Sequence, residues 1–293
     1  MVPTRDRPDM LGRCLAAVQQ ALGPDDEVLV VDSASADARA VAAVAGEAGA
    51  TLVREDLPGA SRARNAGWRA ARHELVALTD DDCLPDPGWL TAYAAASASD
   101  EGATFFWGAV TVETTGTGTA EQGLDGPPTA AHGDDVSLLG PSCNMAVRRA
   151  ALERVGGFDV ELGAGTSLRA AEDRDLQVRL LAAGGRGAFV PDALVQHELW
   201  RSRWALVRLQ HSYGYGSGAL ASKLEQMGID PAQVFSYGVA QTHVRQTLKE
   251  LRGLHEMAVV HNLARASGVW RGRRAAHRLT VAEGHFASPA RTS

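Results

Sequence analysis

The sequence predicts an α/β protein of the doubly wound type, in which short buried strands alternate with helices. The apolar runs over 28–31 and 75–79 are short and unbroken, as in strands that are covered on both faces. Each run ends in acidic residues, Asp32 or Asp80–Asp82, and a helical pattern follows it. Alternation of strands and helices over this length is typical of a largely parallel sheet flanked by helices.

The same patterns predict the other elements. The first part should contain, in order, a helix with Leu11, Leu15, Val18 and Leu22 on one face and Asp9 as its cap, a strand over 28–31, an Ala/Val-rich helix, a strand over 51–54, a helix from Gly59 to about Arg72, the strand over 75–79, and a helix from about Pro87 to Ser97. The second part should contain a strand over 104–112, a long loop over 114–135, a strand and turn over 138–147, helices starting near Arg149 and Ala171, and an extended segment over 189–197.

From Trp200 to about Gly268 the chain is predicted to be largely helical, with breaks near Gly228 and Gly253, and 287–293 reads as a disordered tail. We therefore expect an α/β domain over 1–197 and a mostly helical extension over 198–293. For most of Trp200, Trp204, Tyr213 and Tyr215 in that extension, core packing is the expected role, and the acceptor site or a dimer contact is the alternative.

Composition and charge limit the class of protein. Among 293 residues, 45% are hydrophobic and 22% charged, as in a globular protein. Three cysteines lie at no metal-binding spacing, which favours a reducing, cytoplasmic location. No apolar run is long enough to span a membrane, and no signal-peptide pattern opens the chain.

The net charge of −6 is unevenly distributed. The extension from Glu198 onward holds 13 basic and 6 acidic residues, whereas the part before it holds 16 basic and 29 acidic residues. An acidic first part suits a cation site, and a basic extension suits anions such as lipid headgroups or phosphorylated acceptors, or the acidic part itself. Peripheral membrane contact and a homodimer stay open, and no nucleic-acid partner is expected.

The acidic triplet Asp80–Asp82 is the first candidate site. Carboxylates packed this closely repel one another unless a cation lies among them, and hard divalent cations take oxygen ligands. The ligand crevice of an open α/β sheet lies outside the carboxyl ends of its strands, where Asp32 is also expected. The alternative is a solvated acidic turn that caps the next helix.

Several further motifs follow one another in a recognisable order. They are Pro3, Thr4 and Arg7 at the start; Asp32 and Asp37; Gly59, Ser61, Arg64, Asn65 and Gly67; Asp80 and Asp82; Asn144, Arg148 and Arg149 before Gly156-Gly157-Phe158-Asp159; Glu172, Asp173 and Asp175; and Pro191 to His197. The ordered set resembles the inverting family-two nucleotide-sugar glycosyltransferases of GT-A fold. The resemblance covers residues 1 to about 197, and it departs from many relatives at Ser33, where they carry a second Asp.

The resemblance implies a role for each motif in binding the donor. Asp82 would be a metal ligand, with His197 completing the shell of Mn²⁺ or Mg²⁺ in some relatives. Asp32 would contact the uracil or ribose, Asp80 would support the metal or ribose, and Asp81 would complete the turn beside them. Pro3, Thr4, Arg7 and Arg64 would also lie on the donor side, with the turn at Gly59 presenting a helix N-terminus to anions.

The resemblance also implies the reaction. Asp173 would be the general base that takes the proton from the acceptor hydroxyl, while Glu172 and Asn144 would bind acceptor or sugar hydroxyls. The function expected is hexosyl transfer from an NDP-sugar, with a UDP-sugar favoured, to a glycan, a lipid-linked sugar or a small natural product.

Two other functions stay open at this point. A nucleotidyltransferase of similar topology would usually have a Gly-rich loop near the first strand, where this chain has Pro-Thr-Arg-Asp-Arg-Pro. A non-catalytic sugar-nucleotide-binding protein would not need the complete set of Asp80, Asp82 and Asp173.

Overall fold

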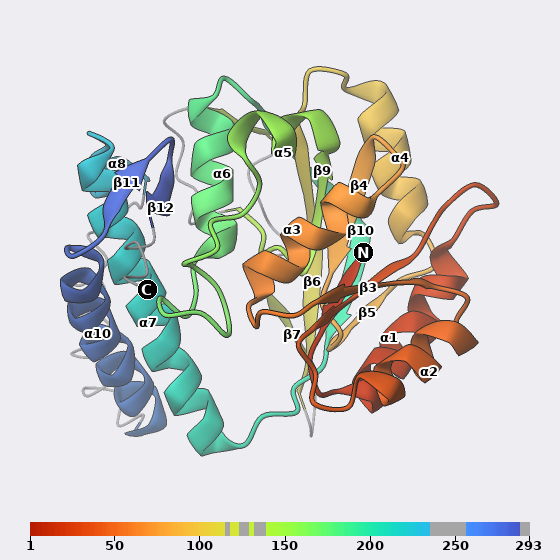
Figure 1. Ribbon diagram of the computed structural model, residues 1–293, viewed down its shortest axis with the longest axis horizontal. Helices are drawn as coiled ribbons and strands as arrows, with labels where there is room; N and C mark the ends of the chain where they lie inside the picture. The colour runs from red at the N-terminus through yellow and green to blue at the C-terminus, as the bar shows by residue number, and fades with distance from the viewer. Residues whose placement is uncertain (115–117, 123–128, 132–138, 235–255, 288–293) are drawn as a thin grey trace. The chain divides into compact units, whose positions relative to one another are not determined.

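A computed structural model describes residues 1–114, 118–122, 129–131, 139–234 and 256–287 (Figure 1). The chain forms two compact units. Unit 1 comprises Met1–His132, Leu138–Phe158 and Leu180–Leu199, and unit 2 comprises Gly133–Ser137, Asp159–Arg179 and Trp200–Ser293. The domain bounds expected from the sequence, 1–197 and 198–293, stay a prediction; in the structure, residues 159–179 group with Trp200–Ser293.

The elements of unit 1 follow the predicted order. They are β1 (Val2–Thr4), α1 (Pro8–Ala21), β2 (Leu29–Ser33), α2 (Ala38–Glu47), β3 (Thr51–Glu55), α3 (Ala60–Ala70), β4 (Leu75–Thr79), β5 (Cys83–Pro85), α4 (Trp89–Ser99), β6 (Phe105–Thr114), β7 (Gly118–Gln122), β8 (Thr129–Ala130), β9 (Asn144–Arg148), α5 (Arg149–Val155) and β10 (Gly187–His197).

Two sheets organise unit 1. Strands β1, β2 and β3 pair in parallel in the order β1-β2-β3, and the second sheet has the order β4-β9-β6-β10-β5 with β7 and β8 at its side. The amide of Thr79 in β4 donates to the carbonyl of Met1 at 3.3 Å, and the Met1 ammonium donates to Ala77 O at 2.7 Å. These bonds place β1 beside β4, so the carboxyl ends of β2, β1 and β4 lie along one edge.

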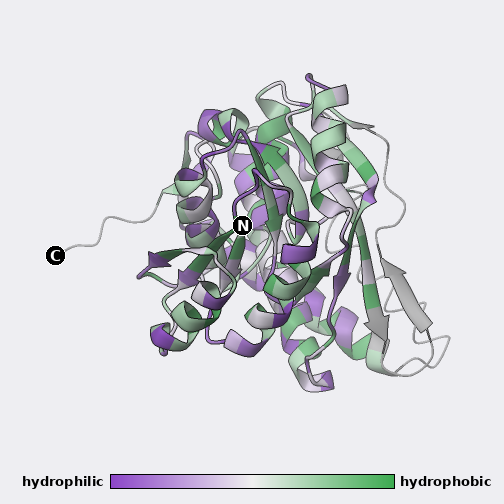
Figure 2. Ribbon diagram, turned by 90° about the vertical axis from the view of Figure 1, so that its right-hand side faces the viewer, coloured by the Kyte–Doolittle hydropathy of each residue, from purple (hydrophilic) through white to green (hydrophobic). Residues whose placement is uncertain are grey.

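Helices cover both faces of the parallel strands, which explains why their apolar runs are unbroken. Val30 packs with the buried residues of α1 and α2, whereas the neighbouring Val31 faces α3. At Gly67 of α3 an added Cβ would overlap the Met1 sulfur and approach Val31, so the glycine permits close contact between helix and sheet. Hydrophobic residues are concentrated in the strands and on the inner faces of the helices (Figure 2).

Unit 2 contains the first part of α6 (Glu172–Ala182), α7 (Arg203–Gln226), α8 (Pro231–Val234), α10 (Glu256–Ala276) and the hairpin β11 (Thr280–Ala282) and β12 (His285–Ala287). Helices α7 and α10 pack backbone to backbone through glycines: a Cβ at Gly214, Gly218, Gly268 or Gly272 would overlap a carbonyl oxygen of the other helix. Within the described residues, no helix has both the length and the apolarity needed to cross a membrane.

Some predictions of local structure are wrong. Asp9 does not cap α1: the helix starts at Pro8 after Arg7, with no side-chain cap. The predicted loop over 114–135 contains β7 and β8, while its residues 115–117, 123–128 and 132–135 lie outside the described part, as do Gly253 and the tail after Ala287. The hairpin over 280–287 was not predicted. The predicted core-packing role is also wrong for three aromatic residues of α7 and the segment before it, because Trp200, Trp204 and Tyr213 are 46%, 67% and 42% exposed.

Candidate active site

The acidic triplet lies between β4 and β5, and its three carboxylates have different environments. The Asp80 side chain is 29% exposed, whereas those of Asp81 and Asp82 are 0% and 5% exposed. A solvated acidic turn would expose all three, so the structure does not support that alternative. The triplet instead presents one accessible carboxylate beside two buried ones.

Residues of the N-terminal motif hold the buried acids. Arg7 lies 2.6 Å from Asp81 Oδ1 through Nη2 and 3.2 Å from Asp82 Oδ2 through Nη1. The Thr4 hydroxyl donates to Asp81 Oδ2 at 2.7 Å. Burial raises the pKa of Asp81 to about 7, against the opposing effects of Arg7 and Thr4. Pro3 is buried within β1, and its contribution to the site is to help position the strand that carries Thr4.

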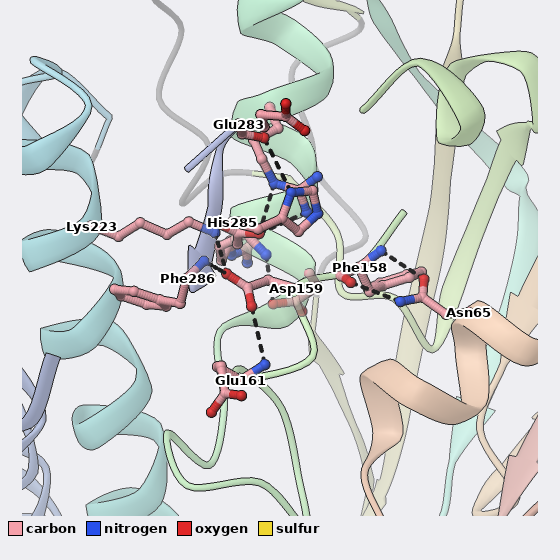
Figure 3. A network of polar contacts seen from close by, with 12 residues as sticks. Asn65, Phe158, Asp159, Glu161, Lys223, Glu283, His285 and Phe286 are labelled. Carbon is pink, nitrogen blue, oxygen red and sulfur yellow. Dashed lines mark hydrogen bonds and ion pairs between the residues drawn. The ribbon is translucent and has the colours of Figure 1, made fainter. Parts of the chain in front are cut away.

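Arg64 and Asn65 of α3 have distinct positions. The Arg64 guanidinium lies 2.7 Å from Asp80 Oδ1 and 5.6 Å from the centre of the Phe158 ring. Asn65 donates to Phe158 O and accepts from Phe158 N, both at 2.8 Å (Figure 3). The Trp68 indole also donates to the Asn65 carbonyl. Asn65 thus fixes the Gly-Gly-Phe turn to α3, while Arg64 approaches the triplet.

Asp32 lies at the same sheet edge as the triplet. It is opposite Thr4 in the register of β1 with β2, and Thr4 in turn bonds Asp81. One carboxylate oxygen accepts from Ser35 N at 3.0 Å, and the other pairs with Arg54 of β3. The motif of an apolar strand ending in Asp predicts this placement. Arg54, which lies opposite Asp32 in β3, was not predicted, because only the strand register reveals it.

Asp82 and His197 form the candidate metal site. His197 ends β10 opposite Cys83 of β5, and its Nε2 lies 3.6 Å from Asp82 Oδ1. The Cys83 sulfur is close to both, but its hydrogen bond with Cys143 and its burial raise the thiol pKa well above the ordinary value. Mn²⁺ and Mg²⁺ also prefer oxygen and nitrogen ligands to sulfur. One carboxylate oxygen and one imidazole nitrogen fit Mn²⁺, and the oxygen also suits Mg²⁺.

The second acidic motif belongs to unit 2. Glu172 and Asp173 open α6 and are half-buried, whereas Asp175 is 1% exposed. The acids lie in the first turn, where the helix dipole favours negative charge. Just before them, Arg169 and Ala171 adopt φ values of 71° and 72°, a conformation that residues other than glycine rarely take.

The structure assigns Asn144 to the core of unit 1 and not to an acceptor site. Its side chain is 0% exposed. The amide donates to Ala109 O and Ala193 O at 2.7 Å, and the carbonyl accepts from the Trp89 indole and the Tyr93 hydroxyl, also at 2.7 Å. All four hydrogen-bonding positions of the amide are used, so a sugar hydroxyl has nothing left to bind.

Comparisons with known proteins agree with this fold. Residues 1–216 match the family described as glycosyltransferase like family 2. S. aureus TarS 1-349 in complex with UDP is 16% identical, with 98% of this chain and 94% of that chain covered and a TM-score of 0.58. The mannosyltransferase PcManGT from Pyrobaculum calidifontis, in complex with GDP-Man and Mn²⁺, is 22% identical, with coverages of 97% and 75% and a TM-score of 0.59. Among the curated proteins, none matches.

The matched segment spans well over half of the chain. It contains both sheets of unit 1 and the acidic triplet described above. The GT-A fold predicted from the ordered motifs is confirmed by the solved glycosyltransferase structures. The chain therefore belongs to glycosyltransferase-like family 2.

Proposed function

We propose that this protein is a metal-dependent, inverting glycosyltransferase that moves a hexosyl group from a nucleoside diphosphate sugar, preferably a UDP-sugar, to an acceptor hydroxyl. The observation that carries the proposal is the pairing of Asp82 with His197 at 3.6 Å, at the sheet edge that also holds Asp32 and Asp80. Family membership and the acidic first turn of α6 support it.

The donor is assigned to unit 1. Asp32 is the hydrogen-bond acceptor for the nucleobase or ribose, and the half-exposed Asp80 supports the ribose. Arg7 and Arg64 are two guanidinium groups at this edge that contact the acidic triplet, and guanidinium groups bind phosphate oxygens well. Because Thr4 and Asp81 bond each other in the interior, we assign them to holding Arg7 in place.

Asp82 and His197 are the proposed ligands of Mn²⁺ or Mg²⁺. When bound, such a cation supplies Lewis-acid neutralisation of the leaving diphosphate. Mn²⁺ and Mg²⁺ prefer oxygen and nitrogen ligands to sulfur, so the carboxylate and the imidazole, and not the neighbouring Cys83 thiol, are the proposed donor atoms.

Asp173 is the proposed general base, and Glu172 binds hydroxyls of the acceptor or the sugar. Inversion requires a base that takes the acceptor proton as the hydroxyl attacks the anomeric carbon. Asp173 offers a carboxylate that is not fully buried. Asn144 has no part in this proposal.

Thermal shift with a panel of UDP, GDP, ADP and dTDP, each with and without Mn²⁺ or Mg²⁺, tests binding. The proposal expects one nucleotide to raise the melting temperature only when metal is present. Transfer or hydrolysis of the matching NDP-sugar is then measured for wild type, Asp82→Asn, Asp173→Asn and the control Asp25→Asn, which changes an exposed acid. Full activity of Asp82→Asn and Asp173→Asn would refute the assigned roles.

A further inference from the structure

Lys223 is a fully buried cation of unit 2. The chain has 29 basic residues, but only Lys223 and Lys249 are lysines. Lys223 lies on α7 with 0% of its side chain exposed, and its Nζ is 2.6 Å from Asp159 Oδ2. The same nitrogen pairs with Asp175 Oδ1. One ammonium group therefore joins two carboxylates that are 16 residues apart in the chain.

The surrounding charges balance. Arg179 donates to Asp175 Oδ2 from both Nε, at 2.9 Å, and Nη2, at 2.7 Å. Two carboxylates thus face an ammonium and a guanidinium, and all four groups are buried. Burial raises the pKa of Asp175, but Arg179 and Lys223 outweigh it, so the pKa lies below its ordinary value. Apolar residues often stabilise a fold as well as buried ion pairs do, so stability alone is a weak explanation of this cluster.

The arrangement fixed here includes two motifs. Asp159 ends the Gly-Gly-Phe-Asp segment, and its carboxylate also accepts from Glu161 N at 3.0 Å and Phe286 N at 2.8 Å. Asp175 lies in the first turn of α6, where its amide donates to Ala171 O at 3.0 Å. Asp173 precedes it by two residues, about 200° around the helix. The ion pair of Lys223 with Asp175 therefore holds the buried side of the first turn of α6, and it does not cover the side that carries Asp173.

A second contact from α7 reaches the same turn. A Cβ at Gly216 would meet the backbone of Ala170 at about 2.5 Å, so helix and segment touch backbone to backbone. Ala170 is flanked by the left-handed residues Arg169 and Ala171, and the Arg169 guanidinium lies 4.6 Å from the Tyr215 ring centre. Strained backbone persists where the surroundings over-determine it, and it is frequent at active sites.

We propose that Lys223 is a positioning residue for Asp173, because its ion pairs with Asp159 and Asp175 fix the first turn of α6. The inference rests on the proposed function, in which Asp173 is the general base. Lys223 itself touches no substrate. Its loss misplaces the base while leaving the donor residues of unit 1 as they are.

The test uses the full chain and three variants. Lys223→Met removes the ammonium but leaves buried carboxylates with one partner fewer. Lys223→Met combined with Asp159→Asn keeps the charges balanced, since Arg179 still pairs with Asp175. Arg208→Met changes an exposed cation of the same helix and is the matched control. The measurements are kcat and KM for the donor, UDP affinity with Mn²⁺ by calorimetry, and amide exchange over residues 169–178.

The proposal expects the balanced variant to be folded, to bind UDP with Mn²⁺ and to keep its donor KM within about twofold of wild type. Its kcat should fall by about 100-fold, the order expected for a displacement of about 1 Å, and amides 172–176 should lose protection. A wild type inactive on every donor overturns the proposed function, and with it the positioning role. An active wild type and a balanced variant with equal kcat and unchanged exchange overturn the positioning role alone.

Discussion

The reassignment of Asn144 leads to a prediction that separates a structural role from a binding role. In the variant Asn144→Ala, four buried groups lose their hydrogen bond to the Asn144 amide: the Trp89 indole, the Tyr93 hydroxyl and the carbonyls of Ala109 and Ala193. Trp89 and Tyr93 are 2% and 0% exposed, so water does not replace the amide without rearrangement.

Each buried polar group left without a partner costs about 1–3 kcal/mol. Four such groups at the lower end give a loss of about 4 kcal/mol, a large fraction of the ~5–15 kcal/mol that stabilises a typical fold. At roughly 2–4 °C per kcal/mol, the melting temperature should fall by about 10 °C. Tyr93→Phe removes one of the four bonds and should cost only about 1 kcal/mol.

Denaturant unfolding of the two variants measures these losses, and steady-state kinetics on the folded fraction measure function. We expect kcat and the KM for the acceptor to be unchanged per folded molecule of Asn144→Ala. If the variant melts like wild type and its KM for the acceptor rises, Asn144 contacts the acceptor and the reassignment is wrong.

Two other sites give predictions of known direction. Gly268→Ala places a Cβ against His211 O and should lower the free energy of unfolding by about 1–3 kcal/mol, measured by chemical denaturation. Gly46→Ala, in a helix and with nothing within 4 Å of the added Cβ, should instead raise the free energy of unfolding by up to about 1 kcal/mol. Equal effects of the two variants would contradict the close packing of α7 and α10. Burial, Arg179 and Lys223 lower the pKa of His285 below 6.5. The unfolded chain then binds a proton that the fold does not, so stability should fall as the pH drops below 6.5. His285→Gln should flatten that slope between pH 7 and 5.5, and an unchanged slope would contradict the burial of a neutral imidazole.

Much of unit 1 could be predicted because its signals are local. Short apolar runs ending in Asp32 and Asp80 give both the strands and their common edge. The helix expected from Gly59 to about Arg72 lies at Ala60–Ala70 in the structure, with Gly59 as its N-cap residue. The cap at Asp9 failed because Pro8, with its fixed φ, already starts the helix.

The missed features depend on contacts that are distant in sequence. Neither the Arg54–Asp32 pair nor the four bonds of Asn144 can be read without strand register. Lys223 had one available signal, as a rare lysine among many arginines, but its partners are 64 and 48 residues away. The hairpin at Glu283-Gly284 was missed because its two residues of positive φ, 51° and 75°, include no Asn or Asp.

The most direct measurement of the central proposal is calorimetric titration of the full chain with UDP and GDP, in Mn²⁺ and in EDTA, for wild type and Asp82→Asn. We expect one nucleotide to bind wild type in Mn²⁺ and to bind at least about tenfold more weakly in EDTA or to Asp82→Asn, since the loss of even a residue that orients a metal ligand typically costs ~10–100-fold. Equal affinity with and without metal, or in wild type and Asp82→Asn, would contradict a metal–diphosphate site at the acidic triplet.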